Sequence, residues 1–161
     1  MPSDKGELAV ETGLSEDHFT RLARVPRATR QDWALARLVG AQRTPYSLDA
    51  LYEVIVFARL RESLKGSADV AWSQLHPSLM AAANNEAVEL VVDLHLLSAA
   101  WVRDDTTIAN VARAGHDVRV IDLTLTLREA RTGFDLAVAA TQAPDQLAAR
   151  RTDRAKRRAE D

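Results

Sequence analysis

Residues 27–43 gather side chains that hydrogen-bond readily to nucleic acid. Arginine presents paired donors that fit guanine, glutamine pairs in a similar way with adenine, and hydroxyls suit phosphate oxygens. This segment lies in a block, residues 18–65, with a net charge of +5, whereas residues 66–140 carry −5. A basic block in an acidic chain predicts an anionic partner, most commonly nucleic acid. The residues expected to contact double-stranded DNA are Arg27, Thr29, Arg30, Gln31, Arg37 and Arg43.

Residues that could support catalysis or hold a metal are few and scattered. The chain has no cysteine, and its four histidines lie in separate segments. Asp93 and His95 would share one face of a strand, but a metal site needs three or four converging ligands, so we interpret them as a surface or edge pair. The chain also contains no glycine-rich phosphate loop, nucleophile elbow or zincin motif. We therefore predict a protein that is not an enzyme, with no catalytic residue, bound metal or cofactor.

Composition narrows the class of protein further. The 161 residues are 47% hydrophobic and 27% charged, which suits one domain or two small ones sharing a core. The apolar runs are too short to span a membrane, and the first residues, MPSDKGELAVE, do not read as a signal peptide. The expectation is a cytoplasmic protein that does not bind membranes.

Three helices are expected to position the DNA-binding residues. Ser15 is a helix N-cap followed by acidic residues, and Pro26 stops this helix or opens the next one. Gly40 is expected to end the second helix, and Trp33 to pack that helix against the third. The expected elements are a helix from Ser15 toward Pro26, a helix over 26–38, a turn or short hairpin over 40–47, and a helix over 48–64.

The second half of the chain is expected to add a small β-rich segment and a final helix. β-Branched residues and intervening turn residues indicate the strands. Pro144 is expected to break the last helix, and the basic tail after it to be either a frayed helix or disordered. The expected elements are helical turns at 70–75 and 78–83, strands at 87–94, 99–102, 106–112 and 118–123, and a helix from Thr124 or Thr126 to about 140.

The predicted fold class is α+β, with an N-terminal winged helix-turn-helix that is mainly α, then a small β-rich segment and a C-terminal helix. Strands or the 125–140 helix could pair across a two-fold axis, because helix-turn-helix proteins usually bind DNA as dimers. The expected divisions are a flexible lead-in at 1–14, a DNA-binding domain at 15–84, a dimerisation or partner-binding segment at 85–142, and a basic tail at 143–161.

The segment from Phe19 to Val39 resembles the MerR-type winged helix-turn-helix. Val25-Pro-Arg-Ala-Thr29 matches the start of that family's recognition helix, and Trp33 matches its aromatic residue. Tyr46-Ser47-Leu48-Asp49 resembles the start of its next helix, with the aspartate one position early. Arg30 and Arg37 depart from the family pattern, which usually has an apolar residue and a glycine there. The remainder is similar to compact actinobacterial MerR-like proteins, some of them antitoxins, which implies a regulator with a small partner-binding segment.

A second register of the helix-turn-helix is also open. Ala9, Gly13, Phe19 and Leu22 have suitable spacing, and the recognition helix would then span 15–24, with Arg21 and Arg24 outward. The later register accounts for Trp33 and places more arginines outward.

The expected function is a dimeric, sequence-specific transcriptional regulator that acts by occupying its operator. One alternative is an antitoxin that autoregulates its operon and binds a toxin through residues 85–142. Others are a phage or mobile-element repressor or excisionase, and a protein-interaction adaptor that does not bind DNA. The basic tail could add nonspecific phosphate contacts.

Overall fold

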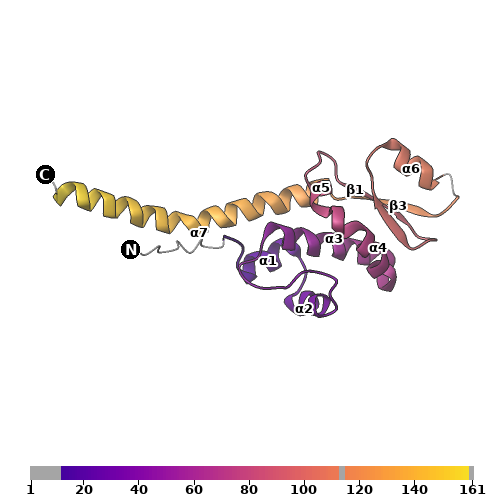
Figure 1. The fold of residues 1–161 in the computed structure, drawn as a ribbon, viewed down its shortest axis with the longest axis horizontal. Coiled ribbons are helices and arrows are strands. Elements are labelled where there is room, and N and C mark those ends of the chain that lie inside the picture. The colour runs from indigo at the N-terminus through magenta and orange to yellow at the C-terminus, as the bar shows by residue number, and fades with distance from the viewer. Residues whose placement is uncertain (1–11, 113–114, 160–161) are drawn as a thin grey trace, which may run out of the picture.

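The computed structural model describes residues 12–112 and 115–159, and it is mixed α+β. A helical N-terminal part is followed by a three-stranded antiparallel sheet and a long C-terminal helix (Figure 1). The final helix runs back past the N-terminal helices and extends beyond the rest of the molecule (Figure 1). No helix within the described residues is both long and apolar enough to cross a membrane.

The first two helices are α1 (Glu16–Ala23) and α2 (Arg27–Leu35). Ser15 caps α1 as expected, because its hydroxyl accepts a hydrogen bond from the backbone N–H of His18. Arg24 ends α1 in the left-handed conformation, with φ 55°, and Pro26 is the N-cap of α2. A tight turn therefore joins the two helices where the sequence predicted one.

Helix α2 ends earlier than expected, because Arg37 rather than Gly40 takes the left-handed position, with φ 60°. The N–H of Leu38 donates to the carbonyl of Trp33 at 2.9 Å, and the N–H of Arg37 donates to that of Ala34 at 3.0 Å. These two bonds form a Schellman motif, which satisfies carbonyls that the helix leaves unpaired. Gly40 instead lies close to the next helix, α3 (Leu48–Leu64), where its N–H donates to Oε2 of Glu53 at 2.7 Å.

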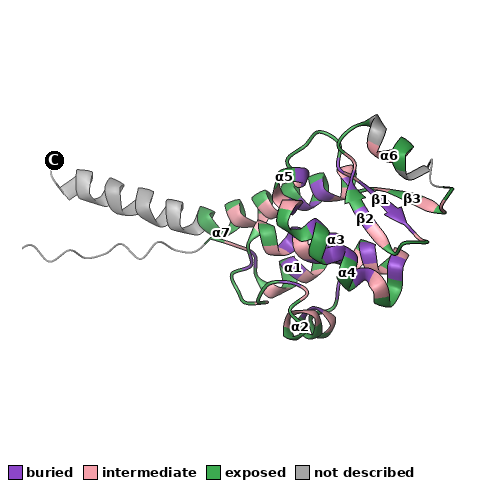
Figure 2. Cartoon of the chain, turned by 45° about the vertical axis from the view of Figure 1, so that its right-hand side comes forward, coloured by how far each residue is buried: buried purple, intermediate pink, exposed green. Residues whose placement is uncertain are grey.

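Helix α3 begins and ends where the sequence predicted and forms the centre of the core. Its hydrophobic residues point to several sides, as is typical of a helix surrounded by other elements (Figure 2). The expected packing of Trp33 against this helix is confirmed, since the Trp33 and Phe57 rings meet edge-on at 4.9 Å. Phe57 also packs against Trp72 of the next helix at 5.4 Å.

Two short helices and two 3₁₀ turns connect α3 to the sheet. They correspond to the helical turns expected at 70–75 and 78–83, with His76-Pro77 marking the break. After a 3₁₀ turn at Lys65–Ser67, the chain forms α4 (Ala68–Leu75), a second 3₁₀ turn at His76–Ser78, and α5 (Leu79–Ala83). The indole N–H of Trp101 in the sheet donates to the carbonyl of Leu75 at 3.1 Å, which anchors the sheet on α4.

The three strands are β1 (Glu89–Asp93), β2 (Ser98–Trp101) and β3 (Val118–Asp122), and they pair antiparallel in the order β2-β1-β3. Leu90 in the central strand faces Trp101 on one side and Ile121 on the other. The sequence predicted these three strands but wrongly placed a fourth at 106–112. Those residues belong to α6 (Asp105–Ala112).

Helix α6 begins directly after Asp104, which acts as its helix-start residue. The Asp104 carboxylate accepts from the backbone N–H of Thr107 at 3.1 Å, which is the role of an N-cap. Acidic residues at this end are also favoured by the helix dipole. The sequence predicts the turn at Asp104-Asp105, but the β-branched residues after it wrongly indicate a strand.

Helix α7 (Thr124–Ala159) passes through Pro144, so the expected break there is wrong. A proline removes one helical hydrogen bond, but residues 145–159 are rich in alanine, arginine and lysine, which favour helix. The beginning of α7 packs on α1 and α3. A Cβ on Gly133 would lie 2.5 Å from the Leu22 side chain, so α7 and α1 approach closely there.

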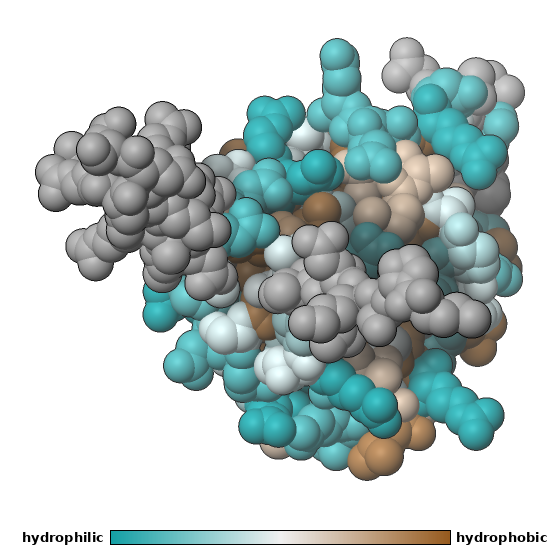
Figure 3. Space-filling view, turned by 60° about the vertical axis from the view of Figure 1, so that its left-hand side comes forward, coloured by the Kyte–Doolittle hydropathy of each residue, from teal (hydrophilic) through white to brown (hydrophobic). Residues whose placement is uncertain are grey.

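One cluster of buried side chains runs from Leu14 through α3 and the sheet to Ala130 in α7. It includes residues from both sides of the boundary expected at 84/85, so the two segments share a core. Of the expected lead-in, residues 1–11 lie outside the described part, and Leu14 is buried and pairs with Tyr46. Hydrophilic side chains cover much of the described surface at the end where α7 leaves the body (Figure 3).

Candidate nucleic-acid interface

The inner side of α2 is fixed by Arg30, whose side chain is completely buried. Its guanidinium donates to Oγ1 of Thr20 at 2.9 Å, to the carbonyl of Val25 at 3.2 Å, and to Oε1 of Gln42 at 3.2 Å. It also forms a salt bridge with Glu16. These contacts connect α1, the turn, α2 and the loop that follows α2.

Aromatic rings enclose the same guanidinium. Its central carbon lies 4.5 Å from the ring centre of Phe19 and 5.5 Å from that of Tyr46. Tyr46 also donates its hydroxyl to Glu16, and its backbone pairs with Leu14. The buried charge is therefore neutralised by Glu16 and hydrogen-bonded on several sides, which a buried cation requires.

The cluster lowers the pKa of Glu16 and raises the pKa of Tyr46. Burial alone would raise the pKa of Glu16, but hydrogen bonds from Tyr46, Arg30 and Thr20, with the charge of Arg30, outweigh it and lower that pKa. Burial and the neighbouring Glu16 carboxylate raise the pKa of Tyr46. Glu16 is thus held ionised and Tyr46 protonated.

This arrangement corrects the expectation that Arg30 faces outward. A side chain with no exposed surface cannot reach a groove of DNA, so Arg30 is a packing residue of this fold. It occupies the position at which the MerR-type pattern has an apolar residue. Its burial explains this departure, because the side chain takes the place of an apolar one in the packing of α2. The signal that could have located it was the complementary set Glu16, Thr20 and Tyr46, which are distant from it in sequence.

The remaining candidate residues lie on or near the outer side of α2. Arg27 and Gln31 are exposed, one helical turn apart on one side of α2, and Thr29 is half-buried beside them. Arg37 is exposed at the end of α2, and Arg43 is exposed in the loop that follows. The structure therefore groups Arg27 with Gln31, while Arg37 and Arg43 flank the helix.

The exposed charges around α1 and α2 are mostly positive. Between residues 15 and 47, five arginines and two aspartates are exposed. Arg21 and Arg24 belong to this set, and the sequence assigned them to DNA only in the second register. Ala9 of that register lies outside the described residues, and the helix over 16–23 is the first of the described pair.

The segment at 40–47 is an irregular loop whose Tyr46 forms a single antiparallel bridge with Leu14. It contains a cis peptide bond between Thr44 and Pro45. Ser47 then caps α3, accepting from the N–H of Ala50 at 3.1 Å. The loop places Arg43 at the surface beside the two helices. Of the short hairpin expected at 40–47, only the bridge between Tyr46 and Leu14 forms.

A second polar cluster lies at one end of the sheet, and the sequence did not predict its central pair. Oδ2 of Asp93 lies 2.6 Å from Nδ1 of His116, and Oδ1 accepts the backbone N–H groups of His95 and Leu96 at 2.8 Å each. Burial would raise the pKa of Asp93, but these hydrogen bonds lower it. Asp93 thus braces the β1–β2 turn and the approach to β3.

The expected pairing of the Asp93 and His95 side chains is replaced by this arrangement. The strand ends at Asp93, so His95 lies in the turn, where its ring packs against that of His116 at 4.8 Å. Across the described parts of the chain, no group of three or more histidine, cysteine, aspartate or glutamate side chains could hold a metal ion.

Comparisons with protein-family models, curated proteins and solved structures give no match for this chain. The resemblance of residues 15–66 to the MerR type therefore stays a prediction. The candidate site consists of two helices linked by the buried Arg30, with exposed arginines and a glutamine on the outer side.

Proposed function

We propose that this protein is a sequence-specific regulator that binds double-stranded DNA through α2 and acts by occupying its operator. The observation that carries the proposal is the division of α2 into two sides. Arg30 and Trp33 fasten the inner side to α1 and α3, whereas Arg27 and Gln31 are exposed. Arg27 Nε also lies 3.6 Å from Oε2 of Glu16 in α1, but its side chain stays 63% exposed. The MerR-type resemblance supports the same assignment.

Each exposed residue has a role that follows from its position. The first turns of a recognition helix approach the base edges, so Arg27 and Gln31 are the residues assigned to direct base contact. Leu35, which is 83% exposed, offers an apolar contact of the kind that suits a thymine methyl. Arg37 and Arg43 are assigned to phosphate or minor-groove contact at the flanks.

The proposed DNA-binding form is a homodimer that presents two copies of α2 to two half-sites. Helix α7 supplies a candidate dimer surface, because Leu125 and Leu136 are 63% and 67% exposed and lie about three turns apart on one side of it. Their pairing with a second α7 would bury apolar surface that the single chain leaves in water.

The first experiment is a fluorescence-anisotropy titration with genomic DNA fragments at two salt concentrations, followed by sequencing of the bound pool. We expect affinity to fall steeply with salt, with a slope of about −0.9 for each phosphate contacted, and an inverted repeat to be enriched. Absence of binding at low salt would contradict the proposal and redirect the search to a protein partner, such as a toxin, on residues 85–142.

Variants then test the assigned side of α2. Arg27→Ala and Gln31→Ala should each weaken binding to the selected site by about tenfold or more, since a bidentate base contact contributes about 1–3 kcal/mol. Arg119→Ala removes an exposed arginine from β3 and serves as the control. Equal effects of all three substitutions would show that α2 does not read the sequence.

A further inference from the structure

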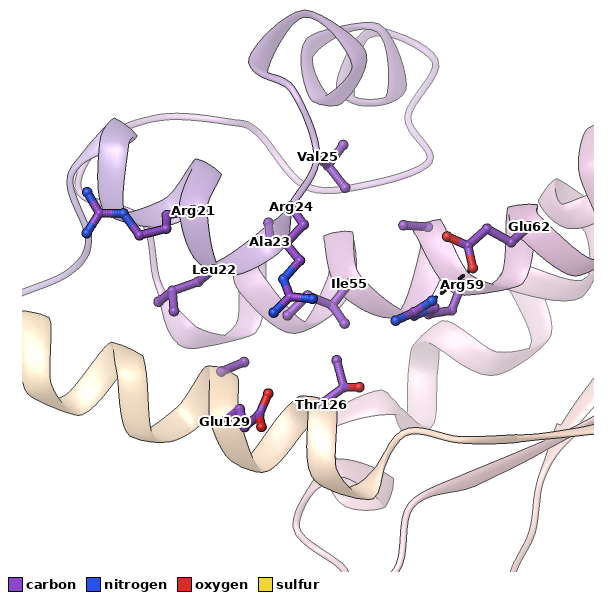
Figure 4. Close-up of a pocket in the computed structure, with 12 residues that line it drawn as sticks. Arg21, Leu22, Ala23, Arg24, Val25, Ile55, Arg59, Glu62, Thr126 and Glu129 are labelled. Carbon is purple, nitrogen blue, oxygen red and sulfur yellow. Dashed lines mark hydrogen bonds and ion pairs between the residues drawn. The ribbon is translucent and has the colours of Figure 1, made fainter.

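A pocket of about 420 Å³ lies behind the proposed DNA-binding surface, between α1, α3 and the first turns of α7. Its size falls within the range of about 300–1,000 Å³ found for small-molecule sites. Figure 4 shows that α2 lies on the far side of α1 and the turn from it. A ligand in this pocket would therefore not contact DNA bound at α2, and its binding would not require DNA.

The wall of the pocket combines an apolar part with two opposite charges. Leu22, Ile55 and Ala130 supply apolar surface from three different helices. The Arg24 side chain enters from the turn after α1, and Glu129 faces it from α7 (Figure 4). Among the described residues, neither Arg24 nor Glu129 takes part in a salt bridge or side-chain hydrogen bond.

The other charged residues of the pocket are already balanced or directed elsewhere. Arg59 pairs with Glu62 at 3.0 Å, so these two charges compensate each other. Arg21 points away from the space between α3 and α7 (Figure 4). Among the lining residues, the groups left for a ligand are the Arg24 guanidinium, the Glu129 carboxylate and the Thr126 hydroxyl.

We propose that this pocket binds a small zwitterion with an apolar side chain, of the kind that an apolar α-amino acid represents. Arg24 binds the carboxylate, Glu129 and Thr126 bind the ammonium group, and Ile55 and Leu22 contact the side chain. Both side chains are exposed and hydrated, so neither needs a partner. A simple anion, however, would be repelled by Glu129, and a simple cation by Arg24. A ligand with both charges satisfies both residues.

A ligand bound to both Arg24 and Glu129 would connect the turn after α1 to α7. Arg24 is the left-handed residue that ends α1 and begins the turn to α2, whereas Glu129 belongs to α7. Because such a ligand binds only the folded chain, it raises the melting temperature, and the rise grows with the logarithm of the ligand concentration above Kd.

The test uses calorimetric titration of the full chain without DNA. The probes are L-leucine and L-phenylalanine, each with the acid that lacks its ammonium group (4-methylpentanoate, 3-phenylpropanoate) and the amine that lacks its carboxylate (3-methylbutylamine, 2-phenylethylamine). We expect at least one amino acid to bind, about tenfold or more tightly than either of its own analogues, since a charge-assisted hydrogen bond contributes about 1.5–3 kcal/mol. If neither amino acid binds up to about 10 mM, or if an acid or amine binds as tightly as its parent, the proposal is wrong.

Substitutions place the binding in this pocket. Arg24→Gln should weaken amino-acid binding about tenfold or more, and Glu129→Gln should abolish the preference for the amino acid over its acid. Glutamine is no more strained than arginine at the positive φ of Arg24, and thermal unfolding verifies that each variant is folded. Arg119→Gln and Glu86→Gln remove the same charges elsewhere and should leave binding unchanged. Amino-acid binding that survives both pocket substitutions would overturn the assignment.

Discussion

A buried arginine, not an exposed one, holds the candidate DNA-binding unit together. Arg30 has no exposed surface and bonds to groups from α1, the turn and the loop after α2. Its charge is compensated by Glu16 and its remaining donors are satisfied, which makes a buried guanidinium tolerable. Residue type alone assigned Arg30 and Arg27 to the same role, and the structure gives them different ones.

We expect Arg30→Ala to destabilise the protein by about 3 kcal/mol, because it removes the buried hydrogen bonds that join α1, the turn and the loop after α2, and leaves Glu16 only the exposed Arg27 as a charge partner. Arg27→Ala removes a mostly exposed side chain and its 3.6 Å ion pair with Glu16, so it should change the free energy of unfolding by less than about 1 kcal/mol. Urea denaturation measures both values. Similar stabilities for the two variants would contradict the structural role given to Arg30.

The lowered pKa of Glu16 predicts a dependence of stability on pH. Glu16 binds its proton less readily in the folded chain than at its ordinary pKa of 4.5, so its contribution is present above that pH and is lost as pH falls through the folded pKa. The free energy of unfolding should therefore decline below about pH 4.5. Glu16→Gln should lower stability at neutral pH and flatten the acid decline, and an unchanged acid decline would show that other carboxylates cause it.

At the scale of elements, the residue that ends α2, Arg37, has an unfavourable backbone conformation and is also a proposed DNA contact. Arg37 adopts a left-handed conformation at the position after a helix where glycine is preferred, since a Cβ is unfavourable there. The sequence placed the helix end at Gly40, three residues later. The chain thus keeps an arginine where a glycine would fit better, next to the proposed interface.

Arg37→Gly should stabilise the protein by about 0.5–1 kcal/mol, because it relieves the left-handed conformation. The same substitution should weaken DNA binding and reduce its salt dependence by about one phosphate contact. Thermal unfolding and anisotropy at two salt concentrations measure the two effects. A gain in stability with unchanged DNA affinity would remove Arg37 from the interface.

At the scale of the whole molecule, α7 joins the two parts of the chain. It begins directly after β3, packs across α1 and α3, and then continues beyond the body (Figure 1). Its inner residues Leu127 and Ala130 are buried in the shared core, whereas Leu136 is exposed. Relative movement of the sheet and the N-terminal helices is therefore restricted by a helix that contacts both.

The proposed dimer predicts a defined response at Leu136. Leu136→Glu should leave the unfolding free energy of the single chain within about 0.5 kcal/mol, as it changes an exposed position. It should shift the full chain from dimer to monomer in sedimentation equilibrium, because a charge would be buried between two copies of α7. Leu35→Glu alters an exposed leucine of α2 and is the control. A dimer that is unaffected by Leu136→Glu must use another surface.

Local chemistry in the sequence was sufficient to define most elements. Caps at Ser15 and Ser47 and the apolar pattern between them gave α1 and α3, because these signals act over one or two helical turns. The sequence also identified the three strands of the sheet, together with the outward residues Arg27 and Gln31. It failed at 106–112 and at Pro144, where opposing local preferences were nearly balanced.

Only the tertiary structure decided which polar residues meet. Arg30 with Glu16 and Tyr46, Asp93 with His116, and Arg24 facing Glu129 are all separated in sequence and brought together by packing. Sequence periodicity reports which side of an element is apolar, but it does not report what lies opposite a polar residue. The burial of a charge depends on that opposite group, because a charged side chain enters the core only where its partners are already placed.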